Sequence, residues 1–279
     1  MGTLEISTRK VVLTGAAQAA QKVRIRIGSI WIDQITLMEA LDSIERLVDS
    51  RRGGAVFTPN VDHLVTAESD AALREAYATA DLALVDGMPV VWASRLLGTP
   101  LPERISGADL TPILLERAAH RGLRVYLFGA LPGVADKAAE RLRDRGIVVA
   151  GTASPVVGLT AQPDEDEIVA QISAARPDLV LVALGSPKQE LFIHRNARQL
   201  APAVCIGVGA TLDFLAGTVR RAPRWMSRAG LEWLFRLIQE PRRLARRYLW
   251  NDPRFAFIVW KTLQAPRATR RLCEEGSAR

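Results

Sequence analysis

Short apolar runs typical of β-strands alternate with amphipathic helical segments from residue 37 to residue 208, and this alternation restricts the folds open to the chain. The β-like runs are 55–58, 82–85, 124–128, 147–150, 179–184 and 204–208, and helical segments include 37–48, 110–119 and 135–142. Strands separated by helices pair in parallel, because each helix carries the chain back to the edge where the next strand starts. We therefore expect an α/β fold with a Rossmann-like, mostly parallel sheet and helices on both faces.

The alternation stops near Gly217, which divides the chain into segments of different character. We predict a flexible leader over 1–22, an α/β domain over 23–217, a helical appendage over 218–266 and a disordered tail over 267–279. The α/β domain is expected to open with a β-ribbon that turns at Gly28-Ser29.

The positive charge of the chain is concentrated in its last segment. From Arg220 to Arg279 there are 15 Lys and Arg residues against 5 Asp and Glu, whereas the preceding residues hold 22 against 25. Such a patch attracts anions, which include lipid headgroups, a diphosphate or nucleic acid.

The appendage shows a helical pattern with two proline interruptions. Residues 222–248 are predicted to be helical with a break at Pro241, since a proline biases the residue before it away from the helix. Asp252-Pro253 offers an N-cap and a first-turn proline for another helix. One face of that helix would carry Phe255, Ile258, Val259 and Leu263, with Phe257 and Trp260 beside them.

Composition limits the cellular setting. Two cysteines provide no disulfide framework, which favours a cytoplasmic protein. No apolar stretch approaches the roughly 18 residues that a transmembrane helix requires. We expect any contact with a membrane to be peripheral.

Polar residues follow four of the predicted strands, and in open α/β sheets ligands bind beyond the carboxyl ends of the strands. Each group also has a purely structural interpretation: Asn60 and Asp86 could be helix N-caps, Asp213 could solvate a first turn, and Ser186 with Gln189 fits a capping box. Their shared position on one edge favours a common site. The groups are Thr58-Pro59-Asn60, Asp86-Gly87, Gly185-Ser186-Pro187-Lys188-Gln189-Glu190, and Gly209 with Asp213.

A glycine-rich turn, Gly129 to Gly133, follows the predicted strand 124–128 and opens a helix. Such a turn either lets backbone N–H groups approach a phosphate or simply provides the geometry of the turn. It is not a dinucleotide fingerprint, and no acidic residue ends the next strand to hold a ribose, so a nicotinamide dehydrogenase is disfavoured. The three histidines are scattered, and we predict neither a metal site nor a cofactor.

Taken together, these residues resemble the WecG/TagA/CpsF family of bacterial glycosyltransferases over roughly 23–255. Many members carry Asn or Pro shortly before the Asp-Gly pair, where this chain has Leu84-Val85. The most specific block is Gly230 to Leu237 followed by Glu240 to Arg243. The resemblance also rests on Thr58-Pro59-Asn60, Asp86-Gly87, Leu127-Phe128-Gly129, Leu184 to Glu190, Gly207-Val208-Gly209 with Asp213-Phe214, and Arg221-Ala222-Pro223.

The resemblance implies an inverting, metal-independent transfer of a sugar from a UDP-sugar to a polyprenyl-diphosphate-linked saccharide. The enzyme would work at the inner face of the cell membrane, bound peripherally to its anionic surface, in exopolysaccharide, teichoic acid or surface-antigen synthesis. It implies Asp86 as the base, Thr58 and Gln189 as positioning residues, and Arg236, Arg243 and Arg246 near the diphosphate. Further substrate-binding residues would be Asn60, Gly129, Gly185, Pro187, Lys188, Glu190, Gly209, Asp213, which matches a position near the uracil, and Arg221.

The residue chemistry agrees with this function independently. A carboxylate can deprotonate the acceptor hydroxyl, and arginines can neutralise the departing diphosphate without a metal. Two other functions stay open: a nucleic-acid-binding protein that uses the basic segment, and a non-catalytic UDP-sugar-binding scaffold. The basic segment lacks a recognisable nucleic-acid-binding pattern, so we expect no nucleic-acid partner, and self-association is open.

Overall fold

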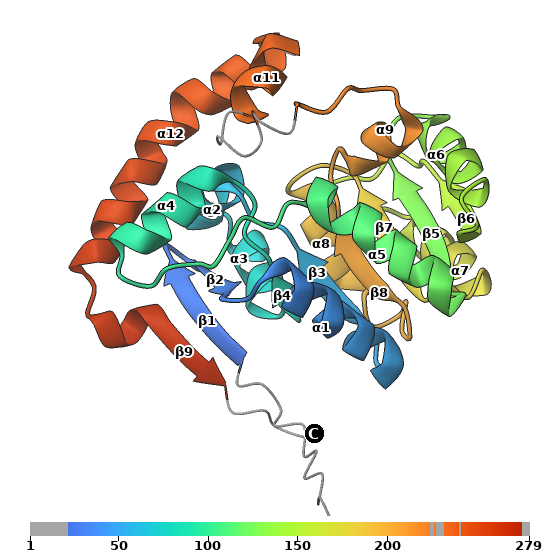
Figure 1. Cartoon of the computed structure of the whole chain (residues 1–279), viewed down its shortest axis with the longest axis horizontal. Coiled ribbons are helices and arrows are strands. Elements are labelled where there is room, and N and C mark those ends of the chain that lie inside the picture. The colour runs from blue at the N-terminus through green and yellow to red at the C-terminus, as the bar shows by residue number, and fades with distance from the viewer. Residues whose placement is uncertain (1–21, 224–225, 227–231, 240, 275–279) are drawn as a thin grey trace, which may run out of the picture.

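The computed structural model describes residues 22–223, 226, 232–239 and 241–274 (Figure 1). The leader expected over residues 1–22 lies outside the described residues except for Lys22, which begins the first strand.

A six-stranded parallel sheet forms the centre of the molecule, with the order β4-β3-β8-β7-β5-β6. The predicted α/β fold with its parallel sheet is therefore confirmed, and every predicted run contains a strand. The strands are β3 Gly54–Phe57, β4 Leu82–Ala83, β5 Arg124–Gly129, β6 Val148–Ala153, β7 Leu179–Ala183 and β8 Val204–Gly207.

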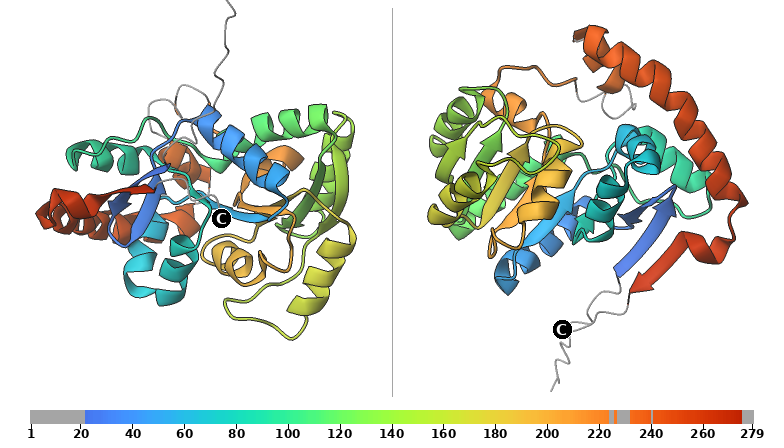
Figure 2. Two further views of the ribbon diagram at one scale, coloured as in Figure 1. Left: turned by 90° about the horizontal axis from the view of Figure 1, so that it is seen from below. Right: turned by 180° about the vertical axis from the view of Figure 1, so that it is seen from behind.

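Helices cover both faces of this sheet, as Figure 2 shows in its view from below. Apart from the edge strand β6, the strands are buried on both sides, and their alternate residues point into one of two apolar cores. One core includes α1 Leu37–Ser50, α5 Gly107–Arg121, α6 Val134–Arg143 and α9 Thr211–Ala216. The other includes α2 Val61–Ser69, α3 Ala71–Ala78, α4 Met88–Leu96, α7 Glu165–Ala174 and α8 Lys188–Asn196.

A second, three-stranded sheet joins the start of the chain to its end. The predicted ribbon is present as β1 Lys22–Ile27 and β2 Ile30–Asp33. β1 also pairs antiparallel with β9 Arg271–Glu274, which follows the 3₁₀ turn η1 Arg267–Arg270. The expectation of disorder from residue 267 is therefore wrong for 267–274, because the free edge of β1 supplies hydrogen-bond partners that the sequence of this segment does not reveal.

The described part of the appendage includes two helices, α11 Glu232–Gln239 and α12 Pro241–Gln264. The predicted break at Pro241 is confirmed, since α12 starts at this proline. The predicted helix start at Asp252-Pro253 is wrong, because Pro253 lies inside α12. A proline inside a helix removes one backbone hydrogen bond, and the rest of this helix continues through it.

The carboxyl half of α12 packs on the body of the protein. Phe255, Ile258 and Val259 are buried and join the same core as α2 and β1. The Thr262 hydroxyl accepts a hydrogen bond from the backbone N–H of Gly28 at 3.1 Å. Part of the predicted apolar face is thus an internal packing surface.

Arg270 fastens the end of the appendage to α4. Its side chain is buried and donates to the Leu97 carbonyl at 3.2 Å, to the Ala265 carbonyl at 3.1 Å and to the Leu263 carbonyl. These bonds hold the turn after α12 against the carboxyl end of α4.

Among the described residues, no helix is both long enough and apolar enough to cross a membrane.

A buried ion pair joins the small sheet to the large one. Arg24 Nε donates to Asp33 Oδ1 at 3.1 Å, and Asp33 Oδ2 accepts from the backbone N–H of Ala83 in β4 at 2.7 Å. Arg24 also donates to the Ala80 carbonyl at 2.7 Å. Both charged side chains are almost completely buried, so each depends on the other for its solvation.

We predict that Asp33→Ala lowers the free energy of unfolding by about 3–5 kcal/mol, because Arg24 would stay buried without its carboxylate. Chemical denaturation measures the change. The matched control is Asp42→Ala, which removes an exposed partner of Arg117 and should cost less than about 1 kcal/mol. Equal losses for the two variants would contradict a structural role for the buried pair.

Candidate active site

The polar groups selected from the sequence lie at the same edge of the large sheet. Thr58, Asp86 and Gly209 follow the neighbouring strands β3, β4 and β8, while Gly185 and the turn at Gly129 follow or end β7 and β5. These five strands are consecutive in the sheet, and all of them are parallel. Parallel pairing therefore brings the carboxyl ends together, as the sequence predicted.

Direct hydrogen bonds join the carboxyl ends of the adjacent strands β4, β3 and β8. The buried Thr58 hydroxyl donates to the Gly207 carbonyl of β8 at 3.2 Å. The backbone N–H of Asp86 donates to the Pro59 carbonyl at 2.8 Å, which joins the loop after β4 to the loop after β3. Asp86 is half-buried, and Gly87 after it has φ +105, a conformation that favours glycine at the start of α4.

Gln189 is buried and links α8 to the end of β8. Its Oε1 accepts from the backbone N–H of Gly209 at 3.1 Å, and its Nε2 donates to Glu190 Oε1 at 2.8 Å. The predicted Ser186–Gln189 capping box is therefore wrong: Pro187 occupies the N-cap position, and no side chain caps α8. The amide of Gln189 makes these buried bonds instead of turning back to the helix terminus.

The network continues from Glu190 to the start of α2. Glu190 Oε1 lies 3.2 Å from His63 Nε2, and His63 Nδ1 lies 2.8 Å from Asn60 Oδ1. Asn60 caps α2, where its Oδ1 accepts from the backbone N–H of Asp62 at 3.0 Å, so its structural interpretation is confirmed. A chain of polar contacts thus runs from Asn60 through His63, Glu190 and Gln189 to Gly209.

Two buried oxygens beside this chain have no hydrogen-bond partner within the described structure, Glu190 Oε2 and the Tyr77 hydroxyl. Tyr77 packs edge-on against Phe57 and His63. Burial raises the pKa of Tyr77 well above its usual value, and the negative charges of Glu190 and Asp86 raise it further. The Tyr77 phenol is therefore neutral, and it lies within the field of both carboxylates.

Sequence reasoning missed His63 and Tyr77 as parts of this cluster. His63 was set aside because the histidines are scattered along the chain. Its position three residues after the N-cap Asn60 was the one available signal, since that spacing places the two side chains on the same side of a first helical turn.

The glycine turn after β5 is tightly packed. Gly129 has φ +96, and a Cβ atom there would lie 2.7 Å from the Ala183 carbonyl oxygen. The backbone N–H of Ala130 donates to that same oxygen at 2.8 Å. The glycine is therefore required by close approach to β7, and its role toward a phosphate stays a prediction.

The remaining residues of the α8 segment form its entry. Gly185 is exposed with φ +73, and the half-buried Pro187 and Lys188 lead into the helix. Lys188 is the first residue of α8, at the same edge of the sheet as Asp86.

Arg221 and Asp213 occupy the side of the site near α5 and α9. Asp213 lies in the first turn of α9, and its carbonyl accepts from Thr218. Arg221 donates to the Ala108 carbonyl at 3.0 Å and to the Asp109 carboxylate. Arg221 therefore anchors the chain after α9 to the start of α5, and its predicted contact with substrate stays untested.

Asp109 is the centre of this anchor. Burial raises the pKa of Asp109, but hydrogen bonds from Arg221 and Ser106 and the nearby charge of Arg104 lower it by more, so the net shift is downward. The carboxylate thus stays charged and holds two arginines. The S-x-x-D pattern of 106–109 was the signal for this N-cap, which sequence reasoning passed over.

The three arginines expected near the diphosphate lie on the appendage. Arg236 belongs to α11, and Arg243 and Arg246 belong to the first half of α12. Their side chains lie outside the described residues, so their direction toward the sheet edge stays a prediction.

Side chains that bind metals are not grouped in the described residues: there, no three His, Cys, Asp or Glu residues come close enough to hold an ion. His63 is occupied by Asn60 and Glu190.

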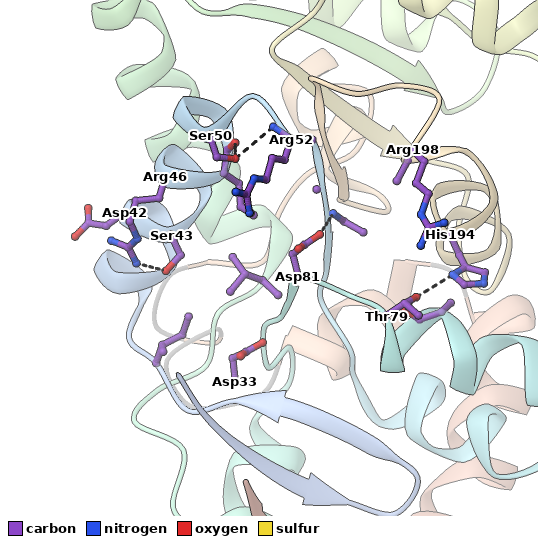
Figure 3. Close-up of a pocket in the computed structure, with 18 of the residues that line it drawn as sticks. Asp33, Asp42, Ser43, Arg46, Ser50, Arg52, Thr79, Asp81, His194 and Arg198 are labelled. Carbon is purple, nitrogen blue, oxygen red and sulfur yellow. Dashed lines mark hydrogen bonds between the residues drawn. The ribbon is translucent and has the colours of Figure 1, made fainter. Parts of the chain in front are cut away.

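A cavity of about 1020 Å³ lies at the opposite, amino edge of the sheet, between α1 and the carboxyl ends of α3 and α8 (Figure 3). Within it, Thr79 Oγ1 lies 3.0 Å from His194 Nδ1, and Asp81 accepts from the backbone N–H of Ala55. None of the residues selected from the sequence lines this cavity. We place the candidate active site at the carboxyl edge, where strand ends, tight glycine turns and the buried polar chain converge.

A polar cluster beyond the carboxyl ends of parallel strands defines a class of α/β proteins that bind ligands at this edge. A protein-family sequence model described as "Glycosyl transferase WecG/TagA/CpsF family" matches residues 25–269 of this chain. This match covers most of the chain, which therefore belongs to the WecG/TagA/CpsF family and is a glycosyltransferase.

Two relatives from bacilli are similar over most of their length. A protein of Bacillus subtilis is 36% identical over 231 residues, which cover 81% of this chain and 86% of the relative. A protein of Bacillus spizizenii is 35% identical over 216 residues, or 77% of this chain and 81% of the relative. Both are named N-acetylglucosaminyldiphosphoundecaprenol N-acetyl-β-D-mannosaminyltransferase.

We predict that Asp109→Asn lowers the thermal unfolding temperature at neutral pH, and that the difference from the unaltered protein shrinks in acid. A lowered pKa in the folded state stabilises the protein above the ordinary carboxyl pKa of 3.8, and this contribution is lost as the pH falls through the lower, folded value. Thermal unfolding over a series of pH values measures the effect. Asp144→Asn, at an exposed position, is the control; a difference that stayed constant down to strong acid would contradict the role of Asp109.

Proposed function

We propose that this glycosyltransferase transfers N-acetylmannosamine, with inversion, from a UDP-sugar to a polyprenyl-diphosphate-linked N-acetylglucosamine. The observation that carries this proposal is the similarity to the two bacillus enzymes, whose names specify both the mannosaminyl group and the undecaprenyl-diphosphate acceptor. The UDP carrier comes from the family resemblance of the sequence blocks at the strand ends.

In this proposal Asp86 is the general base. Inverting transfer needs a carboxylate that takes the proton of the acceptor hydroxyl while the sugar carbon is attacked from the side opposite the leaving diphosphate. Asp86 lies at the carboxyl end of β4, and Gly87 lets the chain turn directly into α4. This short connection keeps the half-buried Asp86 side chain close to the carboxyl end of β4.

Gln189 and Thr58 position the donor in this proposal. Both side chains are buried and hydrogen-bonded to the β8 end, so their own positions are narrowly defined. The glycine turns at Gly185 and Gly209 leave room for phosphate and nucleotide groups, and the turn that begins at Gly129 would present its backbone N–H groups to them. Asn60, Glu190 and Asp213 complete the substrate-binding set, with Pro187, Lys188 and Arg221 at its margin.

The leaving UDP acquires negative charge as the glycosidic bond breaks. Arg236, Arg243 and Arg246 would neutralise this charge, because guanidinium groups bind phosphate oxygens in pairs and remain ionised. The proposed reaction needs no metal for this step. The cationic appendage would also hold the enzyme on the anionic inner face of the membrane, where each cation near the surface contributes about 1 kcal/mol.

A donor and acceptor screen tests the proposed reaction. We expect UDP release from UDP-N-acetylmannosamine only when a polyprenyl-diphosphate N-acetylglucosamine is present, with a β-linked product by nuclear magnetic resonance. If UDP were released from a different UDP-hexose and not from UDP-N-acetylmannosamine, the proposed donor would be wrong. If UDP were released in the absence of the lipid-linked acceptor, the proposed acceptor would be wrong.

We predict that Asp86→Asn lowers kcat about 10²–10⁴-fold, the usual contribution of a general base. UDP binding, measured by calorimetry, should be unchanged, because the amide keeps the shape of the carboxylate. Asp166→Asn, at an exposed position on α7, is the matched control and should leave kcat unchanged. A non-catalytic scaffold would be indifferent to both substitutions.

A further inference from the structure

An apolar groove of about 460 Å³ lies between α4 and α12, outside the polar edge described above. Its floor includes the buried side chains of Phe255 and Val259. Three large side chains on its rim, Trp92, Leu96 and Trp260, are 50–66% exposed, although all are apolar or nearly so. The lining residues are Trp92, Ala93, Leu96, Phe255, Ala256, Val259, Trp260 and Leu263, none of which carries a charge.

Both walls of the groove are helices that carry residues of the proposed site or directly follow one. α4 starts at Met88, directly after Asp86 and Gly87, so this wall leads away from the candidate base. α12 carries Arg243 and Arg246 in its first half and the groove residues in its second half. Figure 1 shows the two helices side by side, with α12 continuing from α11.

One end of the groove lies next to a hydrogen-bonded junction between its two helices. Arg270 donates to the Leu97 carbonyl at the end of α4, and it also binds the Leu263 and Ala265 carbonyls at the end of α12. The two helices are thus joined at their carboxyl ends. From Met88 to Leu96 the wall extends about 12 Å, at 1.5 Å per helical residue.

We infer that this groove binds the hydrocarbon of the acceptor, specifically the isoprene units next to its diphosphate. The inference rests on the proposed function, since it assumes a polyprenyl-linked acceptor. Such an acceptor places its groups in a fixed order: sugar hydroxyl, diphosphate, then hydrocarbon. The chain presents groups in a matching order: Asp86 precedes α4, Arg243 and Arg246 belong to the first half of α12, and the uncharged groove lies between the later parts of both helices.

The lining favours a single extended hydrocarbon. The groove lies between two helices over a buried apolar floor, which fits a single hydrocarbon chain lying along it. Its length covers only the first isoprene units, so the remainder of a long chain would stay in the bilayer. Two tryptophans on opposite walls, Trp92 and Trp260, suit the boundary between these two regions.

The test compares acceptors that differ only in lipid length. Leu96→Gln and Leu263→Gln place amides at exposed rim positions and should leave folding intact. With a long polyprenyl-diphosphate N-acetylglucosamine in detergent, we expect KM for the acceptor to rise about tenfold in each variant, with kcat unchanged, because apolar contact is lost. With an analogue that carries one isoprene unit, both variants should match the unaltered enzyme. Met38→Gln, on α1 and similarly exposed, is the control.

A photoreactive polyprenyl phosphate gives a second readout that does not depend on turnover. In the unaltered protein it should cross-link within α4 or the second half of α12, and Leu96→Gln should reduce the yield. Cross-linking in the groove without any sugar transfer would refute the proposed function but would still support the assignment of the groove to a polyprenyl chain. Transfer that is insensitive to lipid length, or cross-links that map elsewhere, would overturn the groove assignment. A loss of vesicle binding or of self-association in the variants, without a lipid-length effect, would assign the groove to the bilayer or to a second copy instead.

Discussion

The buried chain of polar contacts from Asn60 to Gly209 is the constraint on which the candidate site depends. It crosses the carboxyl edge of the sheet through His63, Glu190 and Gln189, and so connects the loops after β3 and β8 with the starts of α2 and α8. Polar groups buried this deeply must find partners, and partners with fixed positions also fix the backbone that carries them. The position of each strand end is therefore set by side chains as well as by the sheet.

The appendage is anchored at its far end, which changes how it can serve the site. Ile258 and Thr262 pack against the β1–β2 turn, Arg270 binds the end of α4, and β9 extends the small sheet. The small sheet is in turn joined to β4 by Arg24 and Asp33. A continuous set of contacts thus connects α12 to β4, the strand that precedes Asp86. The appendage is therefore attached to the body at its carboxyl end as well as through the chain after Gly217 (Figures 1 and 2).

Local patterns in the sequence predicted the regular elements well and failed where distant contacts decide. The apolar runs identified every strand of the large sheet, since buried parallel strands must be continuously apolar. β9 was missed because Arg271–Glu274 becomes a strand only against the edge of β1. Pro253 was taken for a helix start, whereas α12 continues through it and its second half packs on the body of the protein. In the site, the residues at strand ends could be found, but the link through His63 to Glu190 joins positions 127 residues apart and has no local signature.

The helix α12 combines two kinds of surface along one axis, and this arrangement relates the chemistry to the lipid. Its first half is rich in arginine, and its second half presents a buried face to α2 and an exposed apolar face toward α4. Because both parts belong to one continuous helix, a diphosphate at the arginines and a hydrocarbon at the groove would be held at a fixed separation. α4 begins directly after the candidate base, and Arg270 joins the end of α4 to the end of α12. The position of Asp86 relative to α12 would therefore also be fixed. Recognition of the lipid would then place the acceptor hydroxyl relative to the base, which is how binding energy remote from the reacting bond can contribute to its orientation.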